Sequence, residues 1–276
     1  MTGSDVGVPG PRYIPAHHVL AEMASFGHTR LTDLTSARVL VLAMLAGGFI
    51  TAGALLSVIL GAGIQPSGIR LLVEGLAFGT GFFFVVLSQA VLFTEANVVI
   101  PATLLDRAEP VVPVLRFWAL AFAGNFLGAL TIGALVSAAQ TYPPEVLTLL
   151  AETVDRKMEY RGAGGSVRWL AALLSGVLAN WLVGMAAFFA TMGRTNVGKY
   201  IPVALAVTIF VAANFQHSPA NMGYFSLLML QADGPGWAAA FGWNLVPAGI
   251  GNLIGGTLLV ALPFSFAFGA RAGASL

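Results

Sequence analysis

A histidine stands in the middle of an otherwise apolar run, two residues before a helix-breaking proline. His217 and Pro219 lie between residues 201 and 230, a stretch long enough to cross a bilayer. Pro219 supplies no backbone donor and disfavours helix just before it. Non-helical backbone at membrane depth survives only where protein or a wet cavity surrounds it. An ionisable ring there is costly unless it is paired or used, so this segment predicts a broken helix around a functional site.

A second polar interruption lies in the apolar run from 70 to 105. It contains Thr94, Glu95 and Asn97. The carboxyl of Glu95 admits three interpretations: it caps backbone donors of a broken helix, it couples to His217, or it contacts a permeating molecule. Asn97 is predicted to hold backbone groups that the break sets free, as are Asn221 and Gln216 beside His217.

The composition is that of an integral membrane protein. Hydrophobic residues make up 57% and charged residues 9% of the 276 positions, whereas soluble domains carry about 25% charged residues. Six segments are long enough to span a bilayer, and the second and fifth are the broken ones; these segments are 38–62, 70–105, 113–139, 168–190, 200–231 and 242–269. The sequence therefore predicts an all-α membrane protein. The net charge of +1 does not indicate nucleic acid, and the absence of cysteine excludes thiolate chemistry. No metal or other cofactor is expected.

The two halves of the chain resemble each other. Gly124-Asn125 in the third segment recurs as Gly251-Asn252 in the sixth, and Ala96-Asn97 recurs as Ala220-Asn221 at a nearly equal separation. Each half holds three spans, so the second copy enters the membrane upside down. Transport folds with this symmetry carry their sites near the midplane, where broken helices meet. We therefore expect inverted repeats at about 38–139 and 168–269 within one transmembrane domain, 38–270.

The two ends lie outside that domain. Residues 1–37 are polar but carry apolar side chains at roughly helical spacing, which fits an amphipathic helix on the membrane surface or a partly ordered tail. Residues 271–276 form a short tail. Cytoplasmic termini place more Lys and Arg inside than outside, which predicts a multi-pass protein of the bacterial inner membrane with both ends in the cytoplasm.

At these residues the chain resembles the formate–nitrite transporter family. The most specific matches are residues 92–94, Leu-Phe-Thr, and residues 215–222, Phe-Gln-His-Ser-Pro-Ala-Asn-Met; Gly193-Arg194, Gly198-Lys199 and the Gly-Asn elements fit as well. The resemblance implies an aquaporin-like homopentamer in which each protomer has its own pore. It implies transport of small monovalent anions or their conjugate acids, such as formate, nitrite, hydrosulfide, acetate or lactate.

The resemblance also assigns roles by position. It implies a central pore histidine at His217, a loop threonine at Thr94 and a pore-lining asparagine at Asn180. Apolar constrictions on either side of the histidine would be formed by Phe78, Leu92, Phe93 and Phe210. This sequence departs from the family pattern where Gln216 replaces a glutamate, where Glu95 follows the threonine, and where Gly164 stands at the spacing of an outer lysine. These departures indicate a divergent branch.

The predicted function is a pentameric channel or proton-coupled transporter for small monovalent anions or weak acids. Either His217 gives or shares a proton so that the permeant passes the apolar rings in neutral form, or it stays neutral and only hydrogen-bonds. A neutral-solute pore is a weaker alternative, because the breaks read Glu-Ala-Asn and Pro-Ala-Asn. An intramembrane enzyme with His217 as base is a remote one, because no Gly-x-Ser-x-Gly elbow accompanies it; no enzymatic activity is expected.

Overall fold

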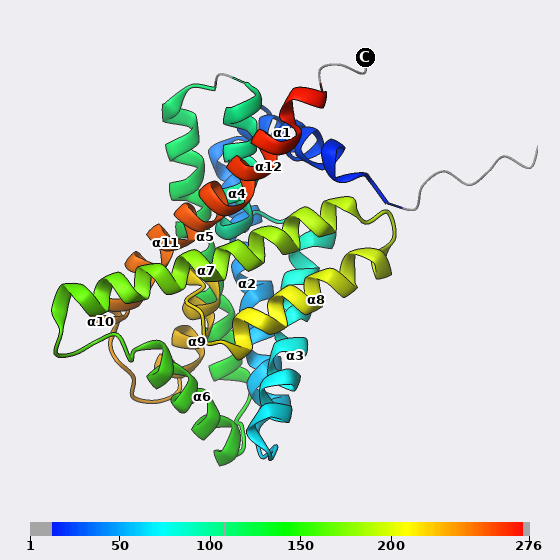
Figure 1. Ribbon diagram of the computed structural model, residues 1–276. Coiled ribbons are helices and arrows are strands. Elements are labelled where there is room, and N and C mark those ends of the chain that lie inside the picture. Colours follow the sequence, from blue (N-terminus) through cyan, green and yellow to red (C-terminus); the bar gives the residue numbers. More distant parts are fainter. Residues whose placement is uncertain (1–12, 108, 273–276) are drawn as a thin grey trace, which may run out of the picture.

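The fold is a bundle of helices of very unequal length (Figure 1). A computed structural model describes residues 13–107 and 109–272, and every regular element in these ranges is helical. The elements are α1 Ala16–Thr32, α2 Ser36–Gly61, α3 Ser67–Ser88, α4 Phe93–Asp106, α5 Val111–Ala139, α6 Pro144–Lys157, α7 Gly165–Met192, α8 Asn196–Ala212, α9 Ser218–Met229, α10 Trp237–Ala240, η1 Phe241–Leu245, α11 Val246–Gly256, η2 Thr257–Ala261 and α12 Leu262–Ala272, where η marks a π-helical stretch.

Among the described residues, five helical segments are long and apolar enough to cross a membrane. They are α2, α3, α5, α7 and the continuous run Trp237–Phe268, with mean hydropathies from 1.8 to 2.3. Leu, Ile and Val side chains project from their outer surfaces, as a lipid environment requires. The chain is thus a multi-pass integral membrane protein. The predicted fifth span is divided between α8, with 17 residues, and α9, with 12.

Both predicted breaks exist, but each lies a few residues earlier than the sequence indicated. Helix α3 ends at Ser88 and α4 begins at Phe93; α8 ends at Ala212 and α9 begins at Ser218. Each break opens near a left-handed polar residue, Gln89 or Asn214, both with φ of 55°. The sequence places the interruptions at 94–97, from the polar residues there, and at 216–221, where Pro219 is taken as the interruption. Proline fits the first turn of a helix, where its missing N–H needs no partner, so Pro219 lies inside the start of α9.

Glycines bring two pairs of long helices into close contact. Helix α5 packs on α2 and α11 packs on α7. A Cβ atom on Gly47 of α2 would overlap the backbone of Asn125, and one on Gly251 of α11 would overlap the carbonyl of Leu173. Small residues allow such approach between membrane helices. The two close contacts carry Asn125 and Asn252 into the interior of the bundle, where both are fully buried.

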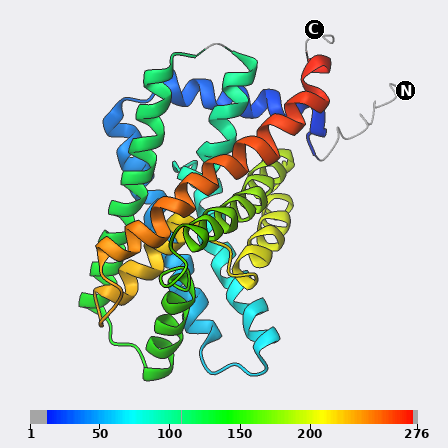
Figure 2. The same cartoon turned by 60° about the vertical axis from the view of Figure 1, so that its left-hand side comes forward.

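The first helix lies across one end of the bundle, on the side where α12 ends (Figure 2). Its apolar residues Val19, Leu20 and Met23 are buried in a cluster with side chains of α4 and α7. The hydroxyl of Thr103 in α4 donates to the Ala24 carbonyl at 3.1 Å. The apolar face of α1 therefore rests on protein. Residues 1–12 of the predicted N-terminal segment and 273–276 of the predicted tail lie outside the described residues, and α12 continues past the predicted domain end to Ala272.

Candidate functional site

The starts of the two half-helices α4 and α9 meet inside the bundle. Thr94 is the second residue of α4 and His217 is the N-cap of α9. Thr94 Oγ1 and His217 Nε2 lie 2.8 Å apart, and neither residue is more than 1% exposed. Helix N-termini carry unpaired N–H groups and a partial positive charge. The arrangement therefore directs two positive dipole ends and a hydrogen-bonded Thr–His pair at one buried point.

The second ring nitrogen of His217 fixes the tautomer. Nδ1 accepts a hydrogen bond from the backbone N–H of Ala220 at 3.1 Å. Because a neutral imidazole has one N–H, an accepting Nδ1 assigns the proton to Nε2, which donates to Thr94 Oγ1. The Thr94 hydroxyl proton then has no partner among the described residues and is free to donate elsewhere. A second proton on the ring would break the cap of α9.

Two asparagines hold the backbone of the two breaks. Asn125 of α5 accepts from the N–H of Phe93 at 2.9 Å and donates to the carbonyls of Val91 at 2.9 Å and Ala43 at 2.8 Å. Asn252 of α11 makes the same set of bonds at the other break. It accepts from the N–H of Ser218 at 2.9 Å and donates to the carbonyls of Gln216 at 2.9 Å and Gly176 at 2.8 Å. The sequence identified both asparagines only as markers of the repeat. It assigned the support of the break backbone to other residues, Asn97, Asn221 and Gln216.

Of the residues predicted to support the breaks, Gln216 holds backbone of its own break: its Nε2 donates to the Asn214 carbonyl at 2.9 Å. Gln216 Oε1 accepts from Asn221 Nδ2 at 2.9 Å and from Asn244 Nδ2 at 2.8 Å. Asn244, which the sequence did not single out, continues this buried network to the Lys157 carbonyl. In the amide orientation that satisfies both groups, Asn97 bridges the Phe93 carbonyl and the N–H of Leu253. Asn97 and Asn221 thus join helices one turn inside α4 and α9.

Asn180 lies next to the Thr–His pair. Its Nδ2 donates to the carbonyls of Thr94 at 3.2 Å and Asn252 at 2.6 Å. Its Oδ1 is buried and has no partner in the described part of the chain. The site therefore has one unused donor, the Thr94 hydroxyl, and one unused acceptor, the Asn180 Oδ1.

Three of the four predicted constriction residues gather in one apolar cluster. The rings of Phe78 and Phe210 meet edge to face at 5.6 Å, and the Phe210 ring lies 5.1 Å from that of His217. Leu92 belongs to the same buried cluster. Phe93 does not: its ring packs on Phe122 of α5 at 5.1 Å, in a separate cluster. Leu92 and Phe93 thus pack against different neighbours.

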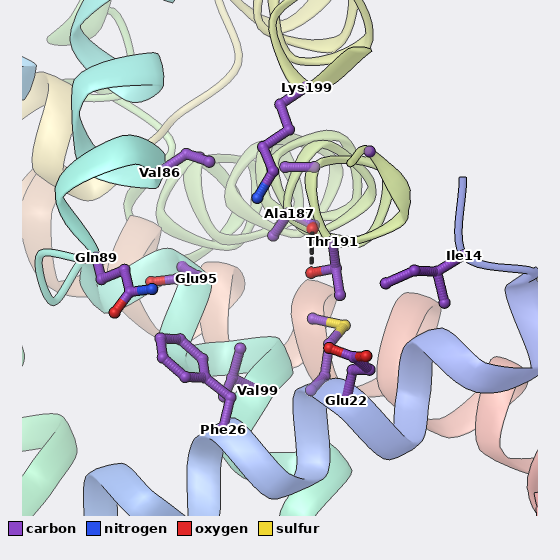
Figure 3. Close-up of a pocket in the computed structure, with 13 residues that line it drawn as sticks. Ile14, Glu22, Phe26, Val86, Gln89, Glu95, Val99, Ala187, Thr191 and Lys199 are labelled. Carbon is purple, nitrogen blue, oxygen red and sulfur yellow. Dashed lines mark hydrogen bonds between the residues drawn. The ribbon is translucent and has the colours of Figure 1, made fainter. Parts of the chain in front are cut away.

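Glu95 is paired with a residue that the sequence did not connect to it. Arg30 Nη1 of α1 donates to Glu95 Oε2 at 3.0 Å. None of the three interpretations offered from the sequence included this pair, because no spacing rule links two residues on separate helices. Glu95 also lines a cavity of about 250 Å³ between α1, α4, the end of α3 and the α7–α8 turn (Figure 3).

A second, smaller cavity of about 150 Å³ lies toward the other end of α3. Its walls include Glu74, Arg156, Lys157 and Phe210. Lys157 ends α6 and is 4% exposed, and its Nζ donates to the Phe215 carbonyl at 3.2 Å inside the α8–α9 break. Burial, and then the neighbouring Arg156 charge, lower the pKa of Lys157 to about 7. Gly164 stands at the spacing where the family pattern has an outer lysine. Lys157, seven residues earlier in the sequence, brings a lysine to the α8–α9 break instead.

Comparisons with known proteins agree with this geometry. The chain matches the family model described as formate/nitrite transporter over residues 17–266. It is 29% identical over 244 residues to a probable formate transporter of Methanothermobacter thermautotrophicus, covering 84% of this chain and 89% of that one. It is 30% identical over 247 residues to the formate channel FocA of Escherichia coli, covering 81% and 84%.

Solved structures share the fold. An FNT family ion channel superposes with a TM-score of 0.77 at 21% identity, covering 91% of this chain and 98% of that one. A pentameric formate channel with formate bound gives 0.70 at 21% identity, covering 84% and 97%. The family model spans nearly all of the described helices, and it includes both breaks and both asparagines that hold them. The chain belongs to the formate/nitrite transporter family.

Proposed function

We propose that this protein is a pentameric channel for small monovalent anions or their conjugate weak acids. The observation that carries the proposal is the 2.8 Å contact between Thr94 and His217 at the point where two helix N-termini meet. One cavity is lined by Glu95, next to Thr94, and the other by Phe210, whose ring lies 5.1 Å from that of His217. Helix N-termini attract anions, and apolar rings bar ions that keep their charge.

The proposed architecture has six crossings in two inverted repeats. Helices α3 and α4 together form the second crossing and α8 and α9 the fifth. The matching bonds of Asn125 and Asn252 support this equivalence. A related structure is described as a pentameric formate channel, and Thr94 and His217 are already buried within a single chain, so we propose five independent pores. The cavity beside α1 faces the cytoplasm of a bacterial inner membrane, and both termini lie on that side.

The site fits a neutral weak acid. An acid such as formic acid has one O–H donor and one carbonyl acceptor. The free Thr94 hydroxyl donates a hydrogen bond to the carbonyl oxygen of the acid, and Asn180 Oδ1 accepts a hydrogen bond from its O–H. Because Nδ1 of His217 is engaged by the backbone of α9, the ring stays neutral and serves to hold Thr94. The proton crosses with the permeant, so transport is coupled to protons and electroneutral.

Flux into proteoliposomes tests the function. Purified protein in vesicles is given formate, nitrite, acetate or lactate at pH 5.5 and pH 7.5, and internal pH and swelling are recorded. Weak acids are expected to enter and to acidify the vesicle interior, and to enter faster at the lower pH. Glycerol and water are not expected to permeate. Equal permeability to glycerol and formate would contradict the proposal and favour a neutral-solute pore.

Lys157 gives the cavity of about 150 Å³, which we call the outer cavity, a charge that depends on pH. With a pKa of about 7 the amine is mostly charged at pH 6 and mostly neutral at pH 8. It attracts anions in the acid range, and the attraction is lost as the pH rises through 7. One such charge contributes about 1 kcal/mol, or about fivefold in anion occupancy. Lys157→Gln should therefore lower formate influx about fivefold at pH 6 and little at pH 8, relative to the parent.

The exposed cation Arg161, four residues further along the chain, provides the matched control. Arg161→Gln should leave the ratio of the two fluxes at the parent value. A Lys157→Gln protein whose loss is the same at both pH values would show that the lysine acts only through its bond to Phe215.

A further inference from the structure

A guanidinium is buried where α1 crosses the start of α4. The Arg30 side chain is 4% exposed. Its Nη1 donates to Glu95 Oε2 at 3.0 Å, and its Nη2 donates to the carbonyls of Gln89 at 3.1 Å and Ala90 at 3.3 Å in the α3–α4 break. The ring of Phe26 lies 4.0 Å from the guanidinium carbon. A buried charge with this many partners is a built feature of the site.

Glu95, the partner of Arg30, borders the cavity of about 250 Å³ beside α1, which we call the inner cavity. Glu95 follows Thr94 in sequence, and its side chain projects into the cavity together with Gln89 from the α3–α4 break (Figure 3). A carboxylate one residue from the hydroxyl that binds the permeant would repel an anion on its way there. An unpaired Glu95 would thus oppose anion entry from this side.

We infer that Arg30 determines the ionic selectivity of the inner cavity by neutralising Glu95. The inference rests on the proposed channel function and adds to it a specificity-determining residue on α1. In this role α1 is a wall of the conduction pathway. The pair leaves the cavity with no net charge from Glu95, while the other arm of Arg30 holds the loop that leads into Thr94.

The remaining charges around Glu95 are balanced. From α1 the cavity receives Glu22, and from α8 it receives Lys199, whose amine projects toward the cavity (Figure 3). The cavity residues of α3 and α7 are uncharged. His217 is connected to Glu95 only through the neighbouring Thr94. Loss of Arg30 would therefore make the cavity net negative, and loss of Glu95 would make it net positive.

The experiment compares three variants with the parent in proteoliposomes oriented with the inner cavity outward. Labelled formate influx is measured against formate concentration. For Arg30→Gln the KM is expected to rise about tenfold, because one uncompensated charge repels the anion. For Glu95→Gln the KM should fall below the parent value. For the double variant the KM should return to within about twofold of the parent, since the charge balance is restored.

Two further measurements separate charge from architecture. Potassium sulfate at high ionic strength should bring the three KM values together, because salt screens the charge. Glu109→Gln removes a different carboxylate contact of α1, the one to His28, which lies outside the cavity. Its KM should equal that of the parent, so that anchoring of α1 in general is not the cause.

The outcomes are distinct. If Arg30→Gln and the double variant show the same rise in KM, charge neutralisation is refuted and Arg30 acts only through the two carbonyls. If the parent protein itself carries no formate, the proposed function fails and not this inference alone. A parent that conducts, with KM unchanged in all three variants, overturns the inference and leaves the function intact.

Discussion

Replacing His217 by phenylalanine should lower weak-acid flux by about a hundredfold or more, whereas glutamine should retain it within about tenfold of the parent. Phenylalanine removes the donor to Thr94 and adds a third ring beside Phe210, which lies 5.1 Å from the imidazole. It also removes the N-cap of α9, which costs about 1 kcal/mol. Glutamine places an amide N–H near the position of Nε2 and so can still hold Thr94, although it cannot titrate. Formate influx and internal acidification in proteoliposomes measure both effects.

A second substitution separates the two nitrogens of the ring. Asparagine at 217 keeps an acceptor at the place of Nδ1 and is a strong N-cap residue, but its amide is too short to reach Thr94. His217→Asn should therefore fold like the parent and conduct much less than His217→Gln. A glutamine variant as inactive as the phenylalanine one, in protein of parental thermal stability, would mean that the imidazole itself must carry the proton. The neutral-acid mechanism would then be wrong.

The backbone positions of the site were predictable because they follow from strong local constraints. A proline and a histidine inside a span admit few arrangements in lipid, and the repeated Gly-Asn elements showed that the two halves of the chain resemble each other. The error of a few residues in each break has a local cause. Pro219 begins a helix as readily as it interrupts one, and the end of the break is held by side chains of distant helices, among them Asn252 and Ser175.

Contacts between distant helices were not predictable. Arg30 and Glu95 are 65 residues apart in sequence, and their pairing depends on how α1 packs against α4. The apolar spacing of α1 is the same for a helix on a membrane surface and for one resting on protein. Lys157 was missed for another reason: the loop between α6 and α7 shifts the lysine away from the position that a fixed spacing to Asn180 indicates. Spacing in the sequence predicts which residues share a face of one helix. It does not predict contacts between separate helices, such as the pair of Arg30 and Glu95 or the bond of Lys157 to the α8–α9 break.

Replacing either Asn125 or Asn252 by leucine should destabilise the protein by about 3 kcal/mol or more and abolish flux. Leucine has the same branching at Cγ and is not smaller, so the change removes hydrogen bonds without opening a cavity. Each substitution leaves one backbone N–H and one carbonyl of the break without their side-chain partner, while the third bonded carbonyl, Ala43 or Gly176, lies inside a long helix. Each buried orphan costs about 1–3 kcal/mol. The backbone of the break is then free to leave the position that brings Thr94 to His217. Thermal unfolding of the purified protein in detergent measures the loss of stability.

The comparison of the two variants also tests the inverted repeat. Both amides are fully buried and each bonds the N–H that starts a half-helix, the carbonyl two residues before it, and a carbonyl of a packed neighbour. Equivalent bonds should give losses within about 1 kcal/mol of each other, since the environments differ mainly in the Ser218 hydroxyl that Asn252 also accepts. The exposed Asn196 at the start of α8 provides the control, because Asn196→Leu removes no such bonds. A large loss of stability for one buried asparagine and none for the other would mean that different interactions stabilise the two breaks. The two Gly-Asn elements would then be similar in sequence without sharing a structural role.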